Sequence, residues 1–217
     1  AGNDTLSLEI AGGSTYQATK LANIETVSAA FTSAGTLTLL GSTGIKTVNA
    51  YGDAANATFT NINSSAIALG FSNTTQTATF GYVPSVVAGT ADSATLTLSN
   101  VEQTSGGGES ITVNGIETLN IVSTGSANTA TIAATGATTL NVSGSQTANL
   151  GTLATATTTT STNTAGLTAS FTAAGAITVV GGAGNDSFTR AAATADSING
   201  GLGNDTVTFT ANLGTTD

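Results

Sequence analysis

The stretch GIETLN, residues 115–120, recurs along the chain with substitutions and decides the fold class. Related phrases are NIETVS at 23–28, GIKTVN at 44–49 and GATTLN at 136–141, with a weaker copy, GAITVV, at 175–180. The phrase at 44 follows the one at 23 by 21 residues, and the phrase at 136 follows the one at 115 by the same interval. The repeating unit is therefore about 20 residues long, which is typical of one rung of a solenoid.

Within each phrase, apolar and polar residues alternate with a period of two, which predicts a half-buried β-strand. One such unit cannot bury its apolar face alone, but stacked units share a continuous core. We therefore expect an all-β parallel β-helix or β-solenoid. Its predicted core positions are Ile24, Val27, Ile45, Val48, Ile116, Leu119, Leu140 and Val179.

The expected organisation is solenoid rungs over residues 1–112, further rungs over 113–180 and metal-binding turns over 181–217. An insertion or subdomain is expected around 71–95, which holds the single proline, Pro84. The phrase weakens over 51–112, so an immunoglobulin-like sandwich of short strands stays open as an alternative there. The Thr-rich segment 155–164 has the composition of a linker, but the flanking apolar residues favour an ordinary rung.

Composition excludes several classes of function. Cys, His, Met and Trp are absent, which removes the side chains that carry most nucleophilic, acid–base and transition-metal chemistry. Twelve Asp and Glu against three Lys and Arg give a net charge of −9, which repels nucleic acid and anionic lipid. No run reaches the roughly 20 apolar residues of a membrane-spanning helix. The chain opens with AGND and no signal peptide, so we expect targeting signals to lie elsewhere in a longer protein.

Two nonapeptides near the C-terminus carry the strongest chemical signal: GGAGNDSFT at 181–189 and GGLGNDTVT at 200–208. Both fit the pattern G-G-x-G-x-D-x-U-x at every defined position, where U is a large apolar residue. The glycines permit a tight turn that aims carbonyls inward, and the Asp adds a negative charge. Stacked turns of this kind suit Ca²⁺, because hard cations prefer carboxylate and carbonyl oxygen.

Two further segments resemble stretches of this nonapeptide. Residues 194–199 keep an Asp and an apolar residue, Asp196 and Ile198, without the glycines. Residues 2–7 reproduce the fourth to ninth positions of the nonapeptide and include Asp4. We expect Asp186, Asp196 and Asp205 to lie close together, with Arg190 as their only basic neighbour.

The nonapeptides resemble those of the RTX family, whose repeats form a calcium-loaded parallel β-roll and whose members leave the cell through type I exporters. This resemblance implies Ca²⁺ as the cofactor. The implied metal-binding residues are Gly181, Ala183, Asn185 and Asp186 in the first copy, Gly200, Leu202, Asn204 and Asp205 in the second, and Asp196 and Asp4.

Sparse nonapeptides combined with GIETLN-like rungs and a Cys-free, Thr/Ala/Gly-rich composition resemble bacterial S-layer proteins exported by type I secretion. The resemblance implies a secreted, non-catalytic component of the cell surface that self-associates into a lattice and reaches cell-surface glycan through other domains. An RTX adhesin segment, binding a surface ligand or acting as a spacer, is the alternative. A glycan-cleaving enzyme would need paired carboxylates, for which Glu102, Glu109 and Glu117 are the candidates, but Glu recurring with the repeat is better explained by structure.

Overall fold

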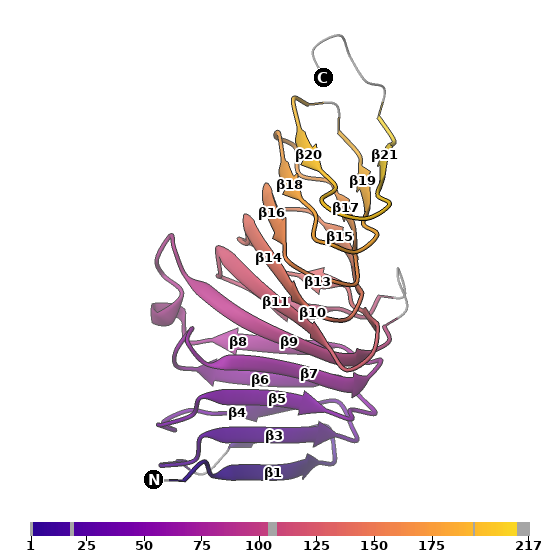
Figure 1. Ribbon diagram of the computed structural model, residues 1–217. Helices are drawn as coiled ribbons and strands as arrows, with labels where there is room; N and C mark the ends of the chain where they lie inside the picture. Colours follow the sequence, from indigo (N-terminus) through magenta and orange to yellow (C-terminus); the bar gives the residue numbers. More distant parts are fainter. Residues whose placement is uncertain (1, 18–19, 104–107, 193, 212–217) are drawn as a thin grey trace.

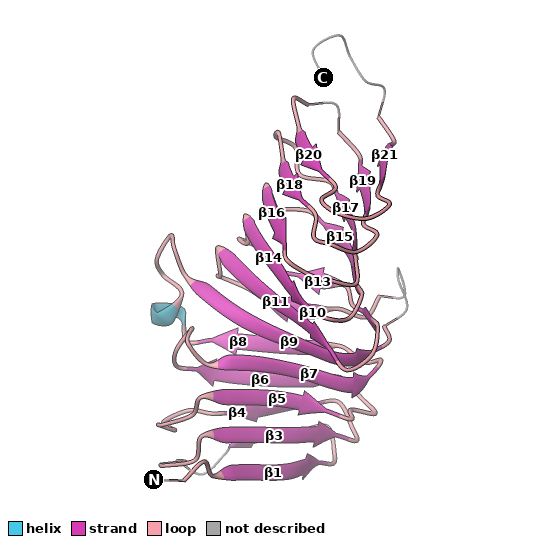
Figure 2. Ribbon diagram, viewed as in Figure 1, coloured by secondary structure: helices cyan, strands magenta, loops and turns pink. Residues whose placement is uncertain are grey.

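The repeat unit winds into a β-solenoid of about nine turns in the computed structural model (Figure 1), which describes residues 2–17, 20–103, 108–192 and 194–211. This confirms the predicted fold class. Strands and turns make up nearly all of the described residues, and a single short 3₁₀ helix, η1 (Pro84–Val86), stands beside them (Figure 2). No helix in these segments is long and apolar enough to cross a bilayer.

One face of the solenoid is a sheet of ten parallel strands, here called the long sheet. Its strands in spatial order are β1 (Thr5–Ile10), β3 (Thr26–Phe31), β5 (Thr47–Tyr51), β7 (Ala68–Thr74), β9 (Ser93–Val101), β11 (Thr118–Thr124), β14 (Thr139–Gly144), β16 (Thr158–Ser161), β18 (Thr178–Val180) and β20 (Ser197–Asn199).

The opposite face is divided between two smaller parallel sheets. The N-terminal sheet comprises β2 (Thr15–Gln17), β4 (Gly35–Thr38), β6 (Ala57–Ile62), β8 (Ala78–Tyr82), β10 (Ile111–Val113) and β13 (Ile132–Ala133). The C-terminal sheet comprises β12 (Asn128–Thr129), β15 (Ala148–Leu153), β17 (Leu167–Phe171), β19 (Ser187–Arg190) and β21 (Thr206–Phe209). The chain alternates between the long sheet and these two sheets. Each turn therefore has an exit edge, where the chain leaves the long sheet, and a return edge, where it comes back.

Strand register gives the length of each turn directly. In the long sheet Thr5 pairs with Thr26 and Thr26 with Thr47, a step of 21 residues. Near the C-terminus Thr178 pairs with Ser197, a step of 19. Larger steps flank β9, where Leu69 pairs with Leu96. The long sheet continues across residues 112 and 180, and η1 lies in the loop that joins β8 to β9 (Figure 1).

Inward-facing side chains stack from turn to turn and form the core. Seven of the eight predicted core residues are buried; Ile24 is half-buried. In the register of β1 and β3, the position one turn below Ile24 is Asn3, so a polar residue stands where an apolar neighbour would cover it. Aromatic residues also stack, with Phe31, Phe59 and Phe80 ring centroids 5.5 Å apart at each step.

The Thr-rich segment forms a rung through β16, as the flanking apolar residues predicted. Its inward side chains are polar, since Thr159 and Ser161 are both buried. Thr159 Oγ1 has no hydrogen-bond partner in the described residues. Burying a hydroxyl without a partner is unfavourable, so this rung is held by its neighbours more than by its own core.

Candidate metal-binding corner

The two nonapeptide loops stack directly on the exit edge. Residues 181–186 connect β18 to β19, and residues 200–205 connect β20 to β21. Leu202 N–H donates to the Gly182 carbonyl at 2.9 Å, and Asn204 N–H donates to Asn185 Oδ1 at 2.9 Å. These two loops, together called the nonapeptide corner, therefore sit one above the other with a step of 19 residues.

Glycine is required in this corner because the stacked backbones approach too closely for a side chain. A Cβ on Gly181 would lie 1.9 Å from the Gly200 carbonyl oxygen and 2.3 Å from Asp186 Oδ2. Gly203 also adopts a positive φ of 122°, a conformation that glycine reaches without steric cost. The nonapeptide glycines thus allow one loop to rest on the next.

Two carboxylates point into the stacked backbone. Asp186 is 2% exposed; its Oδ1 accepts from Leu167 N–H at 2.6 Å and its Oδ2 from Gly182 N–H at 2.9 Å. Asp205 Oδ1 accepts from Asp186 N–H at 2.9 Å. Burial raises the pKa of Asp186, the two N–H donors act against this, and the charge of Asp205 raises it further.

The oxygen donors of this corner fit a hard cation in type. The Gly200 carbonyl oxygen and Asp186 Oδ2 both crowd the space beside Gly181, so carbonyl and carboxylate oxygen, which calcium prefers, lie near each other here. Asp186 Oδ2 already accepts one N–H, so an ion would share this oxygen. Across the described ranges, no three His, Cys, Asp or Glu side chains gather as a metal cluster, so main-chain oxygen would have to complete the shell.

The predicted ligands of the two nonapeptides are brought together, whereas Asp196 is not. Asp186 lies on the exit edge, and Asp196, ten residues later, lies on the return edge in the loop between β19 and β20. Its Oδ1 accepts from Ile177 N–H at 2.9 Å. The expectation that Asp196 joins Asp186 and Asp205 is therefore corrected, because ten residues are half of a 19-residue turn.

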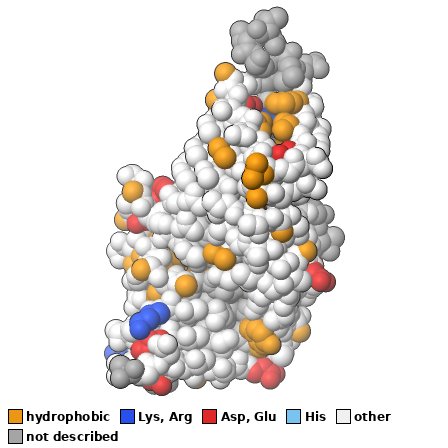
Figure 3. Space-filling model, in the orientation of Figure 1, with side chains coloured by type: hydrophobic (Ala, Val, Ile, Leu, Met, Phe, Trp, Pro, Cys, Tyr) orange, Lys and Arg blue, Asp and Glu red, His pale blue; other side chains and the backbone are white. Residues whose placement is uncertain are grey.

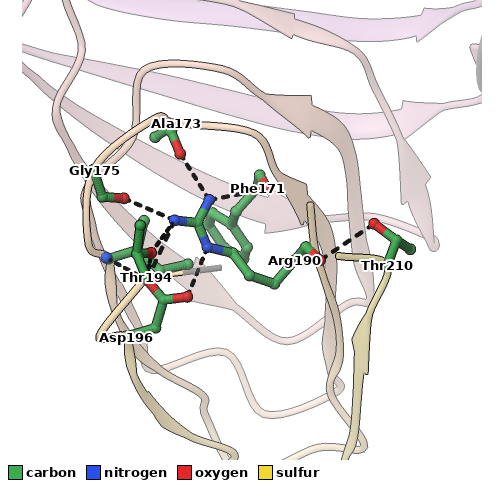
Figure 4. Close-up of polar contacts among 8 residues, drawn as sticks. Phe171, Ala173, Gly175, Arg190, Thr194, Asp196 and Thr210 are labelled. Atoms are coloured by element: carbon green, nitrogen blue, oxygen red, sulfur yellow. Dashed lines mark hydrogen bonds and ion pairs between the residues drawn. The ribbon is translucent and has the colours of Figure 1, made fainter. Parts of the chain in front are cut away.

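Asp196 is instead the partner of a buried arginine (Figure 4). Arg190 Nε donates to Asp196 Oδ2 at 2.8 Å, and the Arg190 side chain is fully buried. Its Nη1 donates to the Ala173 carbonyl and its Nη2 to the Gly175 carbonyl, both at 2.7 Å. Burial alone would raise the pKa of Asp196, but the hydrogen bonds from Arg190, Ile177 N–H and Thr194 outweigh it and lower the pKa below 3.8.

Asp4 is remote from the other three carboxylates, since it precedes β1 at the opposite end of the solenoid (Figure 1). Its N–H donates to Glu25 Oε2 at 2.9 Å. Glu117 has the same role in a later turn, where its Oε2 accepts from Asp92 N–H at 2.8 Å. Glu25 and Glu117 thus each accept a backbone N–H at the return edge of the turn below.

Two of the three carboxylates considered for a hydrolase, Glu102 and Glu117, do not form a pair. Glu117 precedes β11 and Glu102 follows β9, and these strands are parallel neighbours in the long sheet. The two side chains therefore lie at opposite ends of the strands. Comparison of the chain with protein-family models, curated proteins and solved structures found no match.

Three exit-edge residues outside the nonapeptides also cap backbone N–H groups, and two of them, Asn128 and Asn163, were not predicted. Asp53 Oδ1 accepts from Phe31 N–H and Asn128 Oδ1 from Val101 N–H, both at 2.9 Å. Asn163 Oδ1 accepts from Ala165 N–H at 2.7 Å. None is flanked by the glycine pattern. Each does follow a long-sheet strand by two to four residues, and this spacing is the signal that could have identified them.

Proposed function

We propose that this chain is a calcium-stabilised structural segment of a bacterial surface layer, which assembles through contacts between copies. The observation that carries the proposal is the stacking of the two nonapeptide loops in register. In that stack the buried Asp186, the Asp205 carboxylate and the Gly200 carbonyl lie on one corner. Secretion, a cell-surface location and type I export belong to the same proposal.

Calcium would be held by the carboxylates of Asp186 and Asp205 together with main-chain oxygen of residues 181 and 200–204. It would supply positive charge to a corner where two carboxylates approach each other and where burial already raises the pKa of Asp186. A ligand that binds only the folded state stabilises it by RT ln(1 + [L]/Kd), about 2.7 kcal/mol at 100 times Kd. Folding would then be favoured outside the cell, where calcium is plentiful.

The outer surface supports assembly by close side-to-side contact. The face in Figure 3 consists mainly of uncharged polar side chains and backbone, with few charged groups. Most outward residues of the long sheet are small or amide-bearing, with Glu9, Tyr51, Val122 and Val180 as the exceptions. Asn141 Nδ2 donates to Asn120 Oδ1 at 2.9 Å as one step of an Asn ladder. Charged residues are costly to desolvate in an interface, so a surface of this kind can be covered at low cost.

The test compares assembly of the purified chain with and without calcium. Light scattering and negative-stain microscopy should show ordered assemblies in calcium that disperse on chelation. The double variant Asp186→Asn/Asp205→Asn should remain monomeric. Its folding is checked by circular dichroism, because an amide at position 186 can accept only one of the two backbone N–H bonds that Asp186 accepts. Glu9→Gln/Asp92→Asn, which removes the same number of charges elsewhere, should assemble as the wild type does.

A wild-type chain that binds calcium but stays monomeric at every concentration would contradict the surface-layer proposal. The alternative, an adhesin segment acting as a spacer, is favoured by one observation: β1 and β21 lie at opposite ends of an elongated solenoid (Figure 1). A chain that stays monomeric and binds a glycan, or that spans a fixed distance between flanking domains, would support that function.

A further inference from the structure

Asp53 carries a buried oxygen that no group in the described residues satisfies. It follows β5 on the exit edge, six turns before the nonapeptide corner, and is 6% exposed. Its Oδ1 accepts from Phe31 N–H at 2.9 Å, whereas Oδ2 is buried without a hydrogen-bond partner. A carboxylate taken out of water needs donors or a cation, because desolvation disfavours the charged form.

Asn128 shows how the same position is satisfied elsewhere on this edge. Its Oδ1 accepts from Val101 N–H at 2.9 Å, as Asp53 Oδ1 does from Phe31. Its Nδ2 then donates to Ser123 Oγ at 2.8 Å and to the carbonyls of Thr124 and Ser126, both at 2.9 Å. In Asp53 an oxygen replaces this amide nitrogen, so the second atom of the carboxylate cannot donate and needs a hydrogen-bond donor, a proton or a cation instead.

A polar recess of about 340 Å³ lies against Asp53. Its lining comes from three consecutive turns on the exit edge and consists of Asp53, Asn73, Thr74, Thr75, Asn100 and Glu102. Every lining side chain offers oxygen, and neither Lys nor Arg is among them. Asn100 Nδ2 donates to Asn73 Oδ1 at 2.9 Å, so Asn100 Oδ1 remains an acceptor.

We infer that this recess binds a calcium ion, with Asp53 and Glu102 as the charged ligands and amide, hydroxyl or water oxygen completing the shell. The donor set consists of oxygen alone, which suits a hard cation, and Ca²⁺ accepts an irregular shell of six to eight oxygens where Mg²⁺ demands a regular octahedron. Burial also raises the pKa of Asp53 to about 6, against the effect of the Phe31 N–H, as expected of a carboxylate that lacks its counter-charge. The inference is independent of the nonapeptide corner, because the two sites share no residue.

The experiment is calorimetric titration of Ca²⁺ into the full chain, carried out in the Asp186→Asn/Asp205→Asn background. That background removes the nonapeptide carboxylates, so failure of the nonapeptide proposal and failure of this one are distinguishable. One binding event should remain. Adding Asp53→Asn should abolish it, and adding Glu102→Gln should weaken it at least tenfold. Asp92→Asn, which removes one carboxylate outside the recess, should leave the affinity unchanged.

Glu102 is exposed, so Glu102→Gln keeps the site testable even if Asp53→Asn unfolds. The inference is overturned if the background variant binds no Ca²⁺, or if Glu102→Gln binds as tightly as its parent. It is also overturned if Asp53→Asn raises the melting temperature and leaves the affinity unchanged, because Asp53 would then be a protonated capping residue.

Discussion

Arg190 Nε and Asp196 Oδ2 lie 2.8 Å apart inside the C-terminal turns, with the arginine side chain fully buried and the aspartate side chain 4% exposed. The same guanidinium donates to the carbonyls of Ala173 and Gly175 in the turn below. Arg190 therefore joins two successive turns at the return edge. The several N–H donors of the planar guanidinium match the fixed positions of these oxygens. A lysine carries one ammonium group and could not reach all of them.

Replacing Arg190 should destabilise the solenoid strongly. Arg190→Ala removes the donor of Asp196 Oδ2 and the guanidinium donors of the Ala173 and Gly175 carbonyls, and removing one partner of a buried pair costs about 3–5 kcal/mol. Arg190→Lys should recover only a fraction of the loss. Lys46→Ala, at an exposed position, serves as the control and should change stability by less than about 0.5 kcal/mol. Urea titrations of the three variants measure the difference, and equal midpoints for Arg190→Ala and Lys46→Ala would refute the structural role.

The same pair predicts a loss of stability in acid. The pKa of Asp196 in the folded chain is held below 3.8, its value in an unfolded chain. A group with a depressed folded pKa stabilises the fold above its unfolded pKa, and this contribution disappears as the pH falls through the folded value. Urea midpoints measured from pH 6 downward should therefore decline below about 3.8. Asp196→Asn should flatten this decline, and a slope identical to that of the wild type would show that other groups cause it.

The fold could be predicted because one rung repeats the same alternation of apolar and polar residues as the next. Val27, Val48, Leu119 and Leu140 occupy equivalent inward positions, and parallel stacking preserves that equivalence along the chain. The length of each turn was harder to obtain. The longer loops between β7 and β9 increase the step between these two strands to 27 residues, although both strands stay paired in the long sheet.

The sequence predicted the positions of the candidate metal ligands only in part. Each turn of the solenoid has an exit edge and a return edge, and two residues half a turn apart lie on different edges. Asp186 and Asp205 are one turn apart and meet, whereas Asp196 falls between them on the other edge. Arg190 was expected beside these carboxylates and does pair with Asp196, but its burial and its contact with the turn below were not predicted. Alternation from the buried Phe188 places position 190 inward. The two carbonyls that accept from its guanidinium belong to Ala173 and Gly175, 17 and 15 positions earlier, and local sequence does not reveal this contact.

Leu119 tests the core assignment. It is fully buried in β11, and removing a buried Leu side chain to Ala costs about 2–5 kcal/mol. Leu40→Ala is the matched control, because Leu40 is 56% exposed and the change should stay within about 0.5 kcal/mol. Denaturant titration compares the two. A negligible change for Leu119→Ala would contradict its assignment to the core.

Gly181 tests the close contact between the nonapeptide loops. A Cβ at this position would lie 1.9 Å from the Gly200 carbonyl oxygen, so Gly181→Ala must push the two loops apart. Overpacking of this kind costs about 1–3 kcal/mol. Gly175→Ala is the control, since a Cβ at Gly175 meets nothing within 4 Å and Gly175 does not have a positive φ. Thermal unfolding should separate the two variants, and equal melting temperatures would show that the loops are not tightly stacked in solution.

Removing calcium should loosen the C-terminal turns before it unfolds the whole solenoid. Asp186 and Asp205 lie in the last two described turns, where β21 is exposed along its whole length. The rungs around β3 and β5 are instead held by a continuous apolar core that contains Val27 and Val48. Chelation should therefore increase amide hydrogen exchange over 181–209 while residues 26–50 stay protected, and it should lower the melting temperature.

Asp205→Asn keeps an oxygen that can cap Asp186 N–H and removes only the charge, so it should reproduce the faster exchange without chelator. Asp205→Ala removes the cap as well and should loosen the turns further. Unchanged exchange over 181–209 in both chelator and Asp205→Asn would show that hydrogen bonds alone hold this corner, as they hold the Asn128 corner.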